Sequence, residues 1–245
     1  MKQKEDCAMR KFILCIALTA ALIAGCSPVK EKADESYVVK INNTAVSREE
    51  FNIYLYETQK SFEALGGEDI WETDFDGRSA ESVAKDNTLS TVTLVKLAEE
   101  RAVKNGITLD DTEKEDAQTE AEAMYDELTD SQREAIGADK ELYYEVMLEN
   151  FLYNKVYADT VKDYTVSDED FEGYYSTNLE ELKNQYRENV SSDEPINEAA
   201  VKDYSRSNFE KYMKQLYFSK EYEKWESSAI IEKNSEVWNT ITLIR

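Results

Sequence analysis

Apolar side chains recur at helical spacing through most of the sequence, and this pattern predicts a mainly helical protein. The first expected helix begins at Ser47, whose hydroxyl can cap it together with Glu50 three positions later. Gly66 and Gly67 end this helix, because glycine is poorly suited to a helix interior. Its apolar stripe consists of Phe51, Tyr54, Leu55, Thr58, Phe62 and Leu65.

Further helices are expected over about residues 79–105, 110–128, 140–162 and 197–227, with a short one after residue 167. Gly106 suits a left-handed cap at the end of the second helix, and Asp110 with Glu113 forms a capping-box pattern at the start of the third. The helix over 140–162 is apolar on nearly every side, so we expect it to be central.

Two short segments alternate apolar and polar residues, which is typical of strands. Residues 37–46 predict a hairpin with Asn42 and Asn43 in its turn, and residues 229–233 predict a strand followed by a capped helical turn. Only seven Gly and two Pro occur, which is low for a sandwich or a barrel. The expected fold class is therefore all-α with a small β element.

A run of apolar and small residues, 12–25, follows the basic pair Arg10 and Lys11. The run is too short for an ordinary membrane-spanning helix and fits the core of a signal peptide over residues 1–25. A generic secretory signal and a core helix with an incidental cysteine are the alternatives. Translation beginning at Met9 instead of Met1 would give this peptide a more typical start.

The four residues from Ile23 to Cys26 resemble the lipobox of bacterial lipoproteins. In that family the cysteine thiol receives a diacylglycerol, and the chain is cut just before it. The resemblance implies a protein anchored through Cys26 to the extracytoplasmic face of the cell membrane, with polar residues 26–36 as a tether.

Composition excludes several classes of function. Against 29 basic residues stand 52 acidic ones, a net charge of −23 that opposes binding to nucleic acid. The absence of histidine excludes Ser-His-Asp and Cys-His catalysis and ordinary zinc sites, and only Cys26 of three cysteines would survive signal cleavage. We predict no catalytic residue, metal or cofactor. The acids in residues 74–81 faintly suggest calcium, but they lack EF-hand spacing and favour a turn.

The order of elements resembles the SurA and PrsA family of extracytoplasmic folding factors. The segments that carry this resemblance are 38–51, 104–113, 165–182 and 220–241. Asn43 stands where the family usually has a glycine, and asparagine tolerates the left-handed conformation next best. The resemblance implies a single helical domain over 37–245, similar to the SurA N-terminal domain and trigger factor, in which the β element joins the N- and C-terminal segments.

The chain departs from PrsA where the parvulin isomerase domain is usual. Between the N-terminal part, 37–182, and the closing helix and strand, 197–245, only a linker over 183–196 is expected. Parvulins also carry histidines in their catalytic core. We therefore expect a chaperone for unfolded or nascent secreted polypeptides. A peptidyl-prolyl isomerase, as family membership suggests, and a surface lipoprotein without chaperone activity are the alternatives.

The helix over 197–227 carries two apolar faces, so it packs either against two elements or against one element and a client. We expect the second arrangement, and burial of both faces is the alternative. We assign Phe218, Tyr222 and Trp225 to packing, because they lie nearest the closing strand. The face that begins at Val201 is the expected client surface. Its contact residues are Phe209, Tyr212, Met213 and Leu216.

Overall fold

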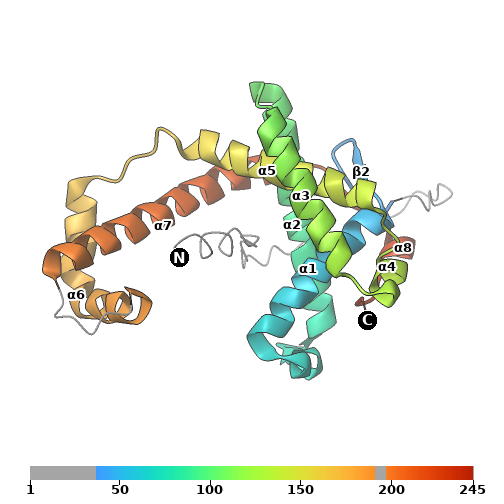
Figure 1. Cartoon of the computed structure of the whole chain (residues 1–245), viewed down its shortest axis with the longest axis horizontal. Coiled ribbons are helices and arrows are strands. Elements are labelled where there is room, and N and C mark those ends of the chain that lie inside the picture. The colour runs from blue at the N-terminus through green and yellow to red at the C-terminus, as the bar shows by residue number, and fades with distance from the viewer. Residues whose placement is uncertain (1–36, 191–196, 245) are drawn as a thin grey trace, which may run out of the picture. The chain divides into compact units, whose positions relative to one another are not determined.

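The structure, a computed structural model, describes residues 37–190 and 197–244. The expected signal peptide, the lipid site Cys26 and the expected tether lie outside the described residues, as do residues 191–196 of the expected linker. Helices dominate, and the short strands are all antiparallel, which confirms the expected fold class (Figure 1).

The chain divides into two compact units, which are described separately. The described residues up to Tyr153, together with those from Ser228 onward, form the first unit. The described residues from Asn154 to Ser227 form the second unit.

A three-stranded sheet in the first unit joins segments from the two ends of the described chain. β1 (Val39–Ile41) pairs antiparallel with both β2 (Thr44–Val46) and β5 (Ile231–Lys233). Ile41 lies opposite Ile231 in this register. The prediction that the closing strand pairs with the N-terminal hairpin is confirmed.

The turn between β1 and β2 differs from our expectation by one residue. Asn42, rather than Asn43, takes the left-handed conformation, with a φ of 53°. The side-chain amide of Asn42 donates to both carboxylate oxygens of Glu100, at 2.8 and 3.0 Å, and its oxygen accepts from the backbone N–H of Ile230 at 2.9 Å. These contacts tie the turn to α2 and to the residue that precedes β5, and local sequence did not reveal them.

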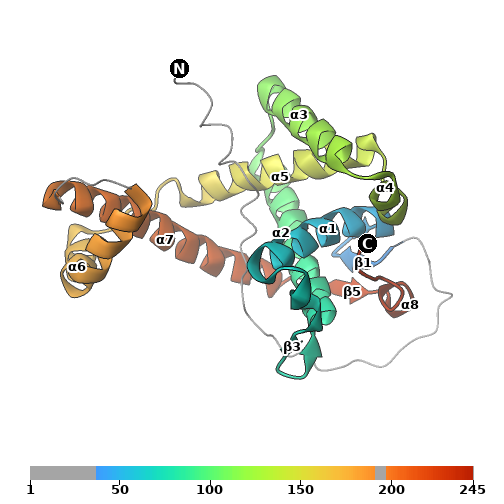
Figure 2. The same cartoon turned by 60° about the horizontal axis from the view of Figure 1, so that its bottom comes forward.

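Two long helices, α1 (Arg48–Gly66) and α2 (Ala80–Asn105), pack against each other in the first unit (Figure 2). The Ser47 hydroxyl caps α1 as predicted by accepting from the Glu50 N–H at 3.1 Å. Gly106 closes α2 in the left-handed conformation, also as predicted. Side chains of these two helices, of the β1–β2 hairpin and of the C-terminal segment form the apolar core. It includes Val38, Val39, Ile41, Val46, Phe51, Ile53, Leu55, Val92 and Ile241.

A short connecting segment joins α1 to α2. It consists of a 3₁₀ helix, η1 (Glu68–Glu72), and a two-stranded hairpin, β3 (Asp74–Phe75) and β4 (Arg78–Ser79). The expected Asp76-Gly77 turn closes the hairpin with φ values of 54° and 85°. The side chain of Asp74 accepts from the Gly77 N–H at 2.7 Å, as expected for a turn.

Three further helices follow α2 along the chain: α3 (Asp111–Glu127), α4 (Asp130–Ile136) and α5 (Lys140–Val161), whose end belongs to the second unit. The capping box of Asp110 and Glu113 is confirmed. Helix α4 was not predicted, although Thr129 and Gln132 form a capping box and Gly137 ends it. A short helix α8 (Ser235–Trp238) follows β5 as the expected capped turn.

The second unit pairs α6 (Asp168–Val190) with α7 (Glu198–Glu226). Helix α7 has nearly the expected bounds, and Asn197 caps it. Helix α6 is much longer than the short helix we expected, because it continues through Lys183 to Val190 into the segment expected to be a linker. Among the described residues, no helix is both long and apolar enough to span a membrane.

Candidate functional site

The four residues predicted to contact clients lie on α7, and one of them is packed against α6. The ring of Phe209 lies 4.4 Å from that of Tyr174, nearly parallel to it, and 6.0 Å from that of Phe171. Val201, two turns earlier, is fully buried. Phe209 therefore packs α7 against α6 and is half-buried.

The other three residues form an open apolar surface, which we call the α7 stripe: Tyr212, Met213 and Leu216. Tyr212 is 55% exposed and Leu216 is 38% exposed, while Met213 is half-buried. Leu216 follows Tyr212 by four positions and Met213 by three, and residues at these two spacings are neighbours on a helix surface. None of the α7 residues from Arg206 to Tyr217 is buried, so the middle of this described helix is lightly covered.

The opposite face of α7 is packed within the second unit. Phe218 is 6% exposed, and its ring lies 5.0 Å from that of Tyr157 on α5. Trp225 is 8% exposed and meets Phe218 edge to face at 5.6 Å. Burial raises the pKa of Tyr222, whose hydroxyl donates to Glu226 at 3.0 Å. The side of α7 that carries Phe218 and Trp225 is therefore packed, whereas the side that begins at Val201 is packed near its start and open from Tyr212 to Leu216.

A buried charged cluster in the first unit was missed by the sequence analysis. The ammonium of Lys96 on α2 lies 2.7 Å from Oε1 of Glu50 and also pairs with Glu149 of α5. The Tyr54 hydroxyl donates to Glu149 at 3.3 Å and accepts from the Asn150 amide at 3.3 Å. Glu50 therefore pairs across to α2 instead of completing the capping box with Ser47.

Two carboxylates, those of Glu50 and Glu149, share one ammonium in this cluster, and the pKa of Glu149 is shifted. Burial raises the pKa of Glu149 to about 7, although Lys96 opposes the shift, and the negative charge of Glu50 adds to it. Burial alone would lower the pKa of Lys96, but Glu149 and Glu50 together raise it. Lys96 therefore stays charged, and the cluster ties α1, α2 and α5 together.

The sequence did carry a signal for this cluster. Lys96 interrupts the apolar run of α2, and Glu149 interrupts that of α5. A charge inside an otherwise apolar run is rarely buried without a partner. The two interruptions, of opposite charge, could therefore have predicted an ion pair between Lys96 and Glu149.

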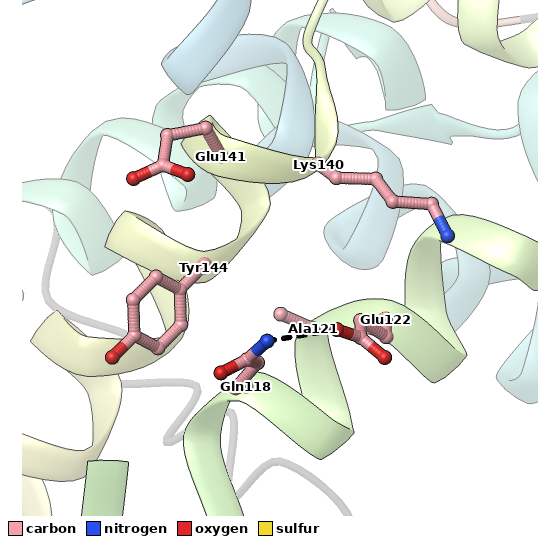
Figure 3. Close-up of a pocket in the computed structure, with 6 residues that line it drawn as sticks. All are labelled: Gln118, Ala121, Glu122, Lys140, Glu141 and Tyr144. Atoms are coloured by element: carbon pink, nitrogen blue, oxygen red, sulfur yellow. Dashed lines mark hydrogen bonds between the residues drawn. The ribbon is translucent and has the colours of Figure 1, made fainter. Parts of the chain in front are cut away.

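A small hollow lies between α3 and α5, with a volume of about 250 Å³ (Figure 3). Its walls are mostly polar, and Gln118 donates to Glu122 across its lower side at 2.9 Å. The lining residues are Gln118, Ala121, Glu122, Lys140, Glu141 and Tyr144. Apolar area for an unfolded chain is lacking there, so the α7 stripe remains the better candidate site.

Comparison with known proteins gives one informative likeness. The chain is 25% identical over 178 residues to the Foldase protein PrsA of Caldanaerobacter subterraneus subsp. tengcongensis. The match covers 71% of this chain and 54% of that protein, so the chain spans about half the length of this curated relative. No protein-family model and no solved structure matches the chain. The likeness supports a PrsA-like family.

Proposed function

We propose that this protein is a lipid-anchored extracytoplasmic chaperone that binds unfolded secreted polypeptides on the α7 stripe. The observation that carries the proposal is the exposure of Tyr212 and Leu216 in the middle of a long helix. The likeness to a protein named as a foldase supports it independently.

The chemistry of the α7 stripe suits weak and general binding. A fully buried aliphatic or aromatic side chain gains about 1.5–3 kcal/mol, so three partly covered residues give a modest affinity that permits release. Tyr212 pairs an apolar ring with a polar tip, and Met213 adapts its shape to different partners. The net charge of −23 keeps such complexes soluble through mutual repulsion.

The proposal includes binding without prolyl isomerisation. The short interval between the end of α6 at Val190 and the start of α7 at Glu198 supports the expectation that no parvulin domain is inserted there. The absence of histidine from the sequence points the same way. The lipid anchor on Cys26 and the extracytoplasmic location complete the proposal, and they rest on the lipobox resemblance.

An aggregation assay tests the binding activity. The chain from Ser27 onward, which keeps every described residue, is mixed with a chemically unfolded client that aggregates on dilution. We expect light scattering to fall as the molar ratio of this protein to client rises. If scattering is unchanged at a several-fold molar excess, the chaperone proposal is wrong.

A further inference from the structure

A second exposed apolar surface lies in the first unit, where α1 passes into α2. We call it the acidic tip, residues 63–77, and the β3–β4 hairpin projects at this end of the α1–α2 pair (Figure 2). Leu65 is 75% exposed on the last turn of α1, and Phe75 of β3 is 36% exposed. The proposed function does not use this surface.

The apolar part of the acidic tip is a built cluster and not a loose loop. The ring of Trp71 stacks on Phe62 at 5.7 Å with an interplanar angle of 7°, and Phe75 meets Phe62 edge to face at 6.4 Å. The Trp71 indole N–H donates to Glu63 at 2.9 Å. Phe62 is buried and lies against both the half-buried Trp71 ring and the exposed Phe75 ring.

The charges around this cluster are of one sign. The sequence from 63 to 77 holds six acidic residues and no lysine or arginine, and all but the first of the acids are exposed. These are Glu63, Glu68, Asp69, Glu72, Asp74 and Asp76. The nearest cations in sequence, Lys60 and Arg78, are paired with Glu57 and Asp86.

We propose that the acidic tip docks a polypeptide segment in which lysine or arginine residues flank aliphatic or aromatic ones. Leu65, Trp71 and Phe75 supply the apolar contact, and the surrounding carboxylates select the basic flanks. Complementary charge of this kind contributes partner choice and association rate more than raw affinity. An anionic membrane or nucleic acid would be repelled by the same carboxylates.

Fluorescence anisotropy with two labelled peptides tests the inference. The peptides share an apolar centre, and one has lysine flanks where the other has glutamate. The protein from Ser27 onward is expected to bind the lysine peptide at least tenfold more tightly. Raising the salt from about 0.05 to 0.5 M is expected to weaken that binding several-fold, because exposed charges are screened.

Matched variants separate the acidic tip from the general negative charge. The triple variant Glu68→Gln, Asp69→Asn, Glu72→Gln is expected to lose about tenfold in affinity for the lysine peptide. The control triple Glu115→Gln, Asp116→Asn, Glu122→Gln removes the same charges from exposed positions of α3 and is expected to lose less than twofold.

A second matched pair tests the apolar contact. Leu65→Ser is expected to weaken lysine-peptide binding about threefold or more, whereas Val103→Ser is expected to leave it unchanged. Val103 is 79% exposed on α2, which makes the two positions comparable. Both variants replace an exposed residue, so neither is expected to unfold the protein.

Two results would overturn the inference: equal affinity for the two peptides, or equal losses in the two triple variants. The second result would assign binding to net charge alone. The double variant Tyr212→Ser, Leu216→Ser removes the α7 stripe and is expected to leave lysine-peptide binding to the acidic tip unchanged. The chaperone proposal and this inference can therefore fail independently of each other.

Discussion

Lys96 on α2 places its ammonium nitrogen 2.7 Å from a carboxylate oxygen of Glu50 on α1, and both side chains are almost fully buried. Glu149 of α5 shares the same ammonium. One cation thus holds three helices of the first unit together. Removing it leaves two carboxylates in an apolar setting, which is far more costly than losing an exposed ion pair.

We expect Lys96→Met to lower the free energy of unfolding by about 3–5 kcal/mol, because it leaves buried carboxylates unpaired. Urea denaturation followed by circular dichroism measures this. Lys114→Met, which removes the partner of Asp111 in an ion pair exposed on both sides, is the control and is expected to cost less than about 1 kcal/mol. Equal effects would show that the cluster does not stabilise the fold.

Stability is expected to depend on pH through Glu149. Its pKa is raised from 4.5 to about 7 in the folded protein, so the folded state binds this proton more tightly than the unfolded state. The resulting stabilisation is complete below pH 4.5 and is lost as the pH rises to about 7. The difference in unfolding free energy between the wild type and Glu149→Gln is expected to fall over that window. A flat difference would contradict the raised pKa.

Lipidation is expected at Cys26. The Cys26→Ala variant is predicted to lose the diacylglycerol modification and to leave the lipidated membrane pool, whereas Cys15→Ala, within the apolar run, is predicted to keep it. Membrane fractionation and mass spectrometry of the mature protein measure both. An unmodified Cys26 in the native mature protein would refute the anchor.

Prolyl isomerisation is expected to proceed at its uncatalysed rate in the presence of the purified protein. The uncatalysed step takes tens of seconds at 25 °C, so even modest catalysis is measurable. A refolding substrate limited by proline isomerisation provides the assay, with a known isomerase as positive control. Acceleration in proportion to the concentration of this protein would revive the isomerase alternative.

The two sides of α7 are expected to respond differently to substitution. Tyr212→Ala with Met213→Ala is predicted to weaken aggregation suppression while changing stability by less than about 1 kcal/mol, because this side is open. Trp225→Ala is predicted to cost about 3–5 kcal/mol, because Trp225 is 8% exposed. Val103→Ala serves as the exposed control for both readouts. If the double variant unfolds and Trp225→Ala does not, the two sides are assigned in reverse.

Local sequence determined the helices and most of their ends. Ser47, Asp110 and Gly106 act at the positions where capping rules placed them, because a cap depends on residues within one turn. Alternation and turn residues likewise predicted the N-terminal hairpin and the closing strand. Helix α4 had an equally local signal at Thr129 and Gln132 that we did not use.

Tertiary structure decided what pairs across the chain. Glu50 has a capping position in the sequence, yet its carboxylate pairs with Lys96, and Asn42 takes the left-handed turn while its side chain contacts Glu100 and Ile230. Phe209 and Tyr212 belong to the same apolar pattern on α7. Phe209 packs against Tyr174 of α6, whereas Tyr212 stays exposed. Periodicity shows which side of a helix is apolar, whereas burial depends on which distant element lies against it.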